Sequence, residues 1–236
     1  MQLPQYKAQK PRETALIWLS QFRNAIGLSA RRKLMRVHGP RAVAEFEARL
    51  PMLGPGDICL DLGANVGLFT QKMAATGCIV HAYEPDPFAW EVLQRNVSHL
   101  PNVTLHHCAV GAVAGTFRLH RSRDFADSPL EQTVMSSIAL HDPKRYQSAD
   151  GIDVEVRGFR EIVGAFERPV ALVKMDIEGA EFDILRQIFA SPSDFDIDAI
   201  YCETHERVAH HEFGEIDRMH RESATMARPL VNLYWP

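Results

Sequence analysis

The sequence predicts an α/β fold, a doubly wound and mostly parallel sheet preceded by an N-terminal helical extension. Three stretches support this prediction. Residues 57–70 and residues 170–189 each have the pattern of a buried strand, a glycine turn and a helix. Residues 78–83 form another apolar, β-prone run, which ends at Glu84-Pro85 and leads into a further helical pattern. Strands that alternate with helices are typical of a parallel sheet covered on both faces.

Length and composition indicate one globular domain. The chain has 236 residues, of which 46% are hydrophobic and 24% are charged. We expect the domain at residues 54–236 and a helical extension or cap at residues 1–53. The formal net charge of -4 argues against a general polyanion binder, so we expect no nucleic-acid partner.

Cysteine usage and hydropathy predict a cytoplasmic location. The four cysteines include no C-x-x-C pair, and we interpret them as small buried thiols in a reducing compartment. No apolar run approaches the length of a membrane span. The start of the chain, MQLPQYKAQK, lacks the apolar region of a secretory signal.

The first fifty residues are expected to be mainly helical. Residues 1–13 are polar and proline-punctuated and should be loosely ordered, whereas residues 14–53 show helical stripes on either side of a break at Gly39-Pro40. A basic cluster lies between the stripes. We interpret it as a solvated helix face, although it could also face an acidic substrate or a membrane surface. Its members are Arg31, Arg32, Lys33 and Arg36.

The glycine turn in DICLDLGANVGLFT is the first candidate for a ligand site. A turn between a strand and a helix is expected to leave free backbone N–H groups where nucleotide-like ligands bind in open α/β sheets. The dinucleotide fingerprint G-x-G-x-x-G is not met, because Asn65 and Leu68 stand where its second and third glycines belong. Asn65 suits a ligand without a pyrophosphate.

An acidic residue follows at the spacing expected for a ribose contact. Glu84 ends the second strand about twenty residues after the turn, where its two oxygens can accept hydrogen bonds from both ribose hydroxyls. The pattern D-x-G-A-N-x-G with this downstream acid resembles the cofactor loop of class I S-adenosylmethionine (SAM) methyltransferases. The alternative is a strand–turn–helix crossover without a ligand.

Residues 87–166 are assigned mainly from periodicity. A long polar stretch at residues 124–151 is predicted to be a substrate-side flap, in which Ser136–Ile138 could form a short strand. The other expected elements are a helix at 87–99, a third strand at 102–110, strands at 115–121 and 152–156, and a short helix at 159–166.

The stretch VALVKMDIEGAE brings two more carboxylates to the same edge of the sheet. Asp176 ends the strand at residues 170–175, Glu178 lies in the turn, and Lys174 could pair with one of them. The strand at 199–203 also ends in an acid, Glu203, two residues before His205. Carboxylates at the mouth of a parallel sheet are costly unless they are paired or used.

The last part of the chain should add a helix and an edge strand. We expect a polar helix at residues 212–226 and an edge strand within residues 230–235. The edge would offer a surface for pairing, so a homo-oligomer is possible. His210, His211 and His220 have no carboxylate partner at ligand spacing, so we expect no metal.

Taken in order, DLGANVGLF, YEPDP, HCAVG, VKMDIEGAE and a strand ending in ET resemble the FkbM-type SAM-dependent methyltransferases. The resemblance implies a Rossmann-like domain that uses SAM as its cofactor. It implies a methionine pocket at Asp61, Gly63, Ala64, Asn65 and Gly67, a ribose contact at Glu84, and an adenine wall at Cys108 and Ala109. Asp176 would lie beside the sulfonium. The candidate catalytic residues are Asp176, Glu178 and His205.

The activity expected from the resemblance is O-methylation of a hydroxyl on a sugar, glycan or small natural product. Alignment and desolvation would be the main contribution of the protein, with a base to take the hydroxyl proton. We expect Asp176 to position and either Glu178 or His205 to act as the base. The alternatives are a non-catalytic SAM- or nucleotide-binding regulatory protein and an NAD-linked oxidoreductase.

Overall fold

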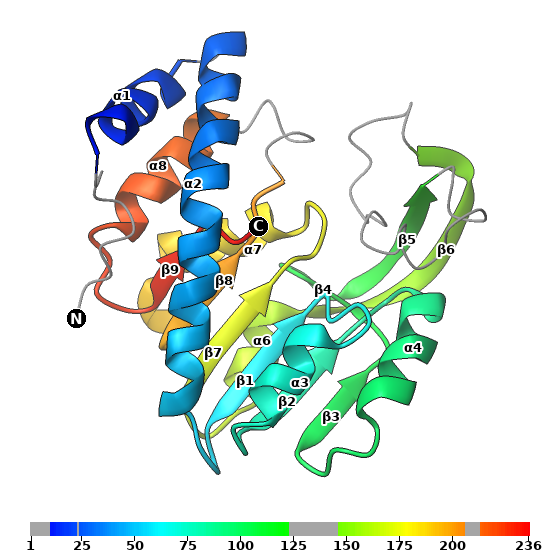
Figure 1. The fold of residues 1–236 in the computed structure, drawn as a ribbon. Helices are drawn as coiled ribbons and strands as arrows, with labels where there is room; N and C mark the ends of the chain where they lie inside the picture. Colours follow the sequence, from blue (N-terminus) through cyan, green and yellow to red (C-terminus); the bar gives the residue numbers. More distant parts are fainter. Residues whose placement is uncertain (1–9, 23, 123–145, 206–212) are drawn as a thin grey trace.

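A six-stranded parallel sheet forms the centre of the molecule (Figure 1). It is seen in a computed structural model that describes residues 10–22, 24–122, 146–205 and 213–236. The α/β prediction is confirmed. In spatial order the strands are β3 (Val103–His106), β2 (Ile79–Tyr83), β1 (Ile58–Leu62), β7 (Val170–Met175), β8 (Ala199–Cys202) and β9 (Leu230–Asn232).

The strand order reverses between β1 and β7. The chain proceeds from β1 outward through β2 to β3, and it later returns to β7 and proceeds the other way through β8 to β9. Both neighbours of β1 run parallel to it, with Leu62 opposite Tyr83 on one side and Met175 on the other. A crevice at the carboxyl ends of strands beside such a reversal is where open α/β sheets bind ligands.

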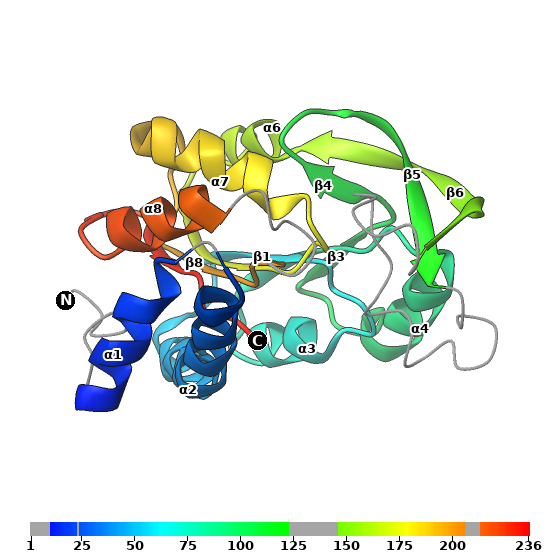
Figure 2. The same ribbon diagram turned by 90° about the horizontal axis from the view of Figure 1, so that it is seen from above.

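Helices cover both faces of this sheet (Figure 2). Alternation along β1 sends Cys59 to one face, where it packs with Met73 and Phe46, and Leu60 to the other, where it packs with Ile184. On the first side lie α2 (Ala25–Arg49), α3 (Leu68–Ala74) and α4 (Pro87–Val97), and on the second lie α6 (Phe159–Gly164), α7 (Glu181–Ala190) and α8 (Phe213–Ser223).

A second, three-stranded sheet lies apart from the main one, and it shows that the strand predicted at residues 102–110 is wrong. It consists of β4 (Ala109–Gly111), β6 (Tyr146–Gly158) and β5 (Gly115–Ser122). The expected single strand at 102–110 is wrong, because β2 ends beside His106 and leaves no partner for a longer β3. The chain turns at Cys108, and Ala109 pairs with Val156 instead.

The loop expected at residues 124–151 is wrong at its C-terminal end, and its role as a substrate-side flap stays a prediction. Residues 146–151 belong to β6, which pairs with β5 in antiparallel register. The proposed short strand at Ser136–Ile138 lies outside the described residues.

The N-terminal helices differ from prediction at Pro40. Helix α1 (Pro11–Ser20) begins within the stretch expected to be loosely ordered, and α2 passes through Gly39-Pro40 without a break. A proline inside a helix costs roughly 3 kcal/mol, but α2 buries an apolar stripe that includes Leu34 and Phe46. Burial of such a stripe, more than local propensity, stabilises helices in proteins.

The C-terminal run forms the expected edge strand, parallel to β8. All four cysteines are free and buried, as predicted. None of the helices in the described ranges has the length and apolar character needed to cross a membrane. The predicted domain boundary at residue 53 stays a prediction. Phe46 of α2, which precedes that boundary, packs in the same hydrophobic cluster as Cys59 of β1.

Trp235 should contribute strongly to stability. It is 1% exposed, and its ring contacts Phe46, Phe69 and Tyr201. We expect Trp235→Ala to lower the free energy of unfolding by about 3–5 kcal/mol, measured by urea denaturation. Trp18→Ala is the matched control. Because Trp18 is 59% exposed, this substitution should lower the free energy of unfolding by less than about 1 kcal/mol. Equal losses would contradict this account of the core.

Candidate active site

The glycine turn brings β1 against the end of β7. Gly63 has φ +74°, and a Cβ there would lie 1.8 Å from the carbonyl oxygen of Asp176, so only glycine is accommodated. The prediction of free amides is wrong for the first residues of the turn, Gly63, Ala64 and Asn65. Gly63 and Ala64 donate to the carbonyl of Tyr83 at 3.0 and 2.9 Å, and Asn65 donates to the Glu84 carboxylate. The turn is therefore a rigid wall rather than a set of free donors.

Glu84 is held by two backbone amides. Its Oε2 accepts from the N–H of Asn65 and its Oε1 from the N–H of Asp86, both at 2.8 Å. Burial raises the pKa of Glu84 to about 7, and the two amides oppose that shift. Each carboxylate oxygen has a second lone pair, so Glu84 can still accept hydrogen bonds from a ligand.

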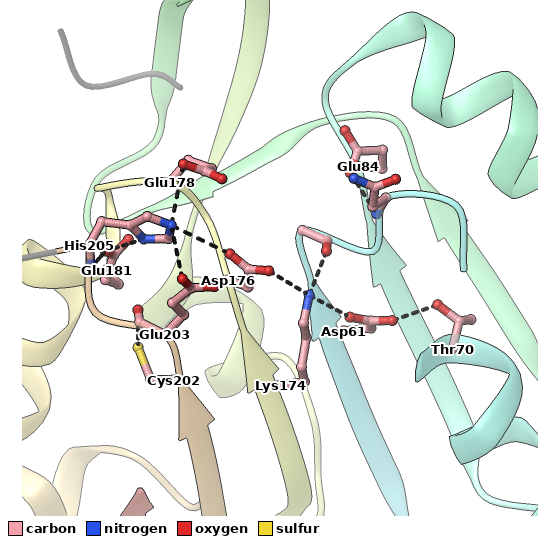
Figure 3. A network of polar contacts seen from close by, with 12 residues as sticks. Asp61, Thr70, Glu84, Lys174, Asp176, Glu178, Glu181, Cys202, Glu203 and His205 are labelled. Atoms are coloured by element: carbon pink, nitrogen blue, oxygen red, sulfur yellow. Dashed lines mark hydrogen bonds and ion pairs between the residues drawn. The ribbon is translucent and has the colours of Figure 1, made fainter. Parts of the chain in front are cut away.

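Lys174 is a buried cation between the two central strands (Figure 3). Its Nζ donates to the carbonyl of Gly63 at 2.7 Å and lies 3.6 Å from carboxylate oxygens of both Asp61 and Asp176. Burial alone would lower the pKa of Lys174, but Asp176 and Asp61 outweigh it and leave that pKa raised. Asp61 also accepts from Thr70 Oγ1 at 2.6 Å.

His205 lies within a group of four carboxylates, which we call the carboxylate–histidine cluster (Figure 3). Its Nδ1 is 2.9 Å from Glu181 Oε1. The other ring nitrogen, Nε2, faces the remaining carboxylates, at 3.3 Å from Glu178, 3.7 Å from Glu203 and 3.9 Å from Asp176. Glu178 has a left-handed backbone, φ 53°, which is uncommon for a residue with a side chain and is enriched at functional sites.

The contacts within the cluster shift the pKa values of its members in different directions. Burial alone would lower the pKa of His205, but Glu181 and Glu178 hold that pKa well above 6.5. Burial would raise the pKa of Glu181, and His205 outweighs it and leaves that pKa lowered. Burial, together with Asp176, raises the pKa of Glu203 to about 7. His205 therefore carries a proton at neutral pH.

A cavity of about 290 Å³ opens where these groups converge. Its volume is close to the lower end of the range of small-molecule sites, roughly 300–1,000 Å³. Backbone and apolar side chains from the turn and from β4 form one part of the wall, and carboxylates form another. Among the predicted residues, those that line it are Gly63, Ala64, Asn65, Glu84, Cys108, Ala109, Asp176 and Glu178.

Three predicted residues lie behind the wall. Asp61 is 1% exposed and faces Lys174 and Thr70. Gly67 packs against α4, since a Cβ there would lie 2.8 Å from Leu93. His205 contacts the cavity through Glu178. Glu181, which orients His205, had no distinguishing sequence signal, because an acid in the first turn of a helix is usually solvated.

Asp176, Glu178 and His205 are near enough to share a metal ion. One ligand atom from each lies within 4.8 Å of the others. A cation would compete with a proton for Nε2 of His205, because a metal ligand must be deprotonated. The expectation that no metal binds stays a prediction.

Comparison with known proteins assigns the chain to a family. The family model for the Methyltransferase FkbM domain matches residues 61–223, which cover the glycine turn, the second strand, Lys174 and the cluster. The chain belongs to the FkbM methyltransferase family. The recognition made from the sequence motifs is confirmed.

Curated relatives carry methyltransferase names. Methyltransferase 1 of Beauveria bassiana is 30% identical over 142 residues, or 54% of this chain and 56% of that protein. The 31-O-demethyl-FK506 methyltransferase FkbM of Streptomyces tacrolimicus is 27% identical over 179 residues, or 65% of this chain and 67% of that protein. Ribosomal RNA small subunit methyltransferase A of Thermotoga maritima is 36% identical over 63 residues, or 27% and 23% of the two chains.

Lys174 should be essential to the stability of this FkbM-family site. We expect Lys174→Gln to lower the free energy of unfolding by about 3–5 kcal/mol, because it leaves the buried Asp61 and the partly buried Asp176 without their cation. The matched control is Lys72→Gln, whose partner Glu47 is exposed and whose loss should cost at most about 1 kcal/mol. Urea denaturation of both variants checks this, and a small equal loss would contradict the role given to Lys174.

Proposed function

We propose that this protein is a SAM-dependent O-methyltransferase that acts on a hydroxyl of a small molecule or glycan. The observation that carries the proposal is the cavity at the strand reversal, which has Glu84 in one part of its wall and Asp176 and Glu178 in another. The FkbM relative supports the choice of reaction, because it is named as a methyltransferase of 31-O-demethyl-FK506. SAM has no pyrophosphate, which agrees with a turn whose amides are paired within the protein.

The residues of the wall match the chemistry of SAM. Glu84 can accept hydrogen bonds from the ribose, and Cys108, Ala109 and Val110 offer an apolar surface for the adenine. Asp176 places negative charge where the ammonium and sulfonium of the methionine part would lie. When bound, SAM supplies an activated methyl group, and the protein supplies alignment and exclusion of water.

The proton of the acceptor hydroxyl needs a base beside the cavity. The prediction left Glu178 and His205 open for this role, and the geometry favours Glu178. His205 already holds a proton between Glu181 and Glu178, whereas Glu178 is a carboxylate that lines the cavity. His205 then acts as a positioning residue that orients Glu178 and balances its charge.

The first test is ligand binding. Calorimetry should show saturable binding of SAM and of S-adenosylhomocysteine and none of NAD. Because burial raises the pKa of Glu84 to about 7, its carboxylate is lost as the pH falls. SAM affinity should therefore be about tenfold lower near pH 6 than near pH 8.

Two variants separate Glu84 from other titrating groups. Glu84→Gln should weaken SAM binding at every pH and flatten the pH dependence. Glu203→Gln should leave the pH dependence in place, because Glu203 has a similarly raised pKa but does not line this cavity. Binding of NAD in place of SAM would overturn the proposed function.

The second test concerns the base. With a methyl acceptor in hand, Glu178→Gln should lower kcat by about 10²–10⁴-fold and leave the Kd for SAM nearly unchanged. His205→Gln should lower kcat less and shift the pH profile, since it removes only the group that orients Glu178. Glu155→Gln serves as an exposed control. Full turnover by Glu178→Gln together with none by His205→Gln would assign the base to His205 instead.

A further inference from the structure

A second and larger cavity borders the carboxylate–histidine cluster. Its volume is about 620 Å³, within the range typical of small-molecule sites. One side comes from α2 and carries three arginines of the basic cluster, Arg31, Arg32 and Arg36. The other side comes from Glu203 and Thr204, which directly follow β8. The cavity therefore joins a cationic helix face to the candidate active site.

Two of the arginines are available to a ligand. Arg32 and Arg36 lie four residues apart, and therefore on one face of α2, and both are exposed. Neither makes a hydrogen bond or ion pair within the described part of the chain. Arg31 is different, because it is buried and its Nη2 contacts the carbonyl of Ser20 at 2.6 Å and Asp217 at 2.5 Å. Arg31 therefore anchors the helix, and the other two face the cavity.

Thr204 adds a hydroxyl that lacks a partner. The residue is 7% exposed, and its Oγ1 is buried without a hydrogen-bond partner among the described residues. Buried polar groups of proteins are nearly always paired, and an unpaired one is costly. Because Thr204 lines the cavity, a ligand there can supply the missing partner.

Each of the two cavities is lined by members of the cluster. Glu203 lines the second cavity and lies 3.7 Å from Nε2 of His205. The same Nε2 lies 3.3 Å from Glu178, which lines the first cavity. His205 is therefore the side chain that links the wall of the second cavity to the wall of the first.

We propose that the second cavity binds the phosphate of the methyl acceptor, which makes the substrate a phosphorylated hydroxyl compound. The inference rests on the proposed function and names its substrate class. Guanidinium groups match phosphate oxygens in geometry and charge, and the Thr204 hydroxyl can donate a further hydrogen bond. Glu203 repels an anion, so the phosphate lies at the Arg32 and Arg36 end and the hydroxyl at the cluster end.

The test begins with pyrophosphate as a probe, titrated at fixed ionic strength with and without S-adenosylhomocysteine. Wild-type protein should bind it saturably. Arg32→Gln and Arg36→Gln should each weaken binding by about tenfold or more, because each removes a charged hydrogen-bond donor. Thr204→Val should weaken binding less. The matched control is Lys33→Gln, an exposed cation of the same helix that does not line the cavity.

Two results would overturn the proposal at this stage. One is the absence of saturable binding at millimolar pyrophosphate. The other is equal weakening by Lys33→Gln and Arg32→Gln, which is the behaviour of a solvated basic helix face. Binding of S-adenosylhomocysteine is measured on the same samples. If the wild-type protein did not bind S-adenosylhomocysteine, the result would count against the proposed function. If it bound S-adenosylhomocysteine but not pyrophosphate, the result would count only against the phosphate site.

The second arm compares acceptors in pairs. Labelled SAM is incubated with hydroxyl compounds that are offered with and without a phosphate group. We expect the labelled methyl group to be transferred to the phosphorylated compound of each pair. Arg32→Gln and Arg36→Gln should raise the KM for that compound about tenfold without changing the KM for SAM. The proposal would be overturned if the compounds without phosphate were methylated and neither arginine variant changed the rate.

Discussion

The candidate site depends on the burial of one ammonium group, that of Lys174, at the point where the strand order reverses. Its hydrogen bond to the Gly63 carbonyl joins the β1 turn to β7, and its charge lies between Asp61 and Asp176. A buried carboxylate is tolerated only when it is paired. Lys174 therefore lets Asp176 reach the cavity wall as an anion while Asp61 and Thr70 hold the start of α3 from behind.

The surrounding carboxylates divide into roles according to what each one faces. Glu84 is fixed by amides of the chain around it, whereas Glu181 is fixed by His205. Burial raises the pKa of Glu84 and Glu203 to about 7, and His205 keeps the pKa of Glu181 lowered. Similar side chains with separated proton affinities are a general feature of sites that both bind cations and move protons.

Much of this arrangement could be predicted from local patterns. Apolar runs located the strands of the main sheet, and acids at the ends of three of them placed Glu84, Asp176 and Glu203 at one edge. The errors arose where distant contacts decide the outcome. Pro40 stays helical because α2 is packed along its length, and residues 102–110 divide because β2 ends first. Glu181 is 0% exposed, and only the fold distinguishes it from a solvated acid.

The basic cluster of α2 shows how one sequence feature gains meaning from its position. Read alone, Arg31, Arg32, Lys33 and Arg36 are typical of a solvated helix face. In the fold, Arg31 pairs with Asp217. Arg32 and Arg36 line the cavity with exposed side chains, whereas Lys33 is not among the lining residues. The unpaired Thr204 hydroxyl lines the same cavity, on the segment that leads to His205. An anion between them would lie close to the carboxylates that a methyl acceptor must approach, so the cationic helix and the acidic edge are two ends of one binding path.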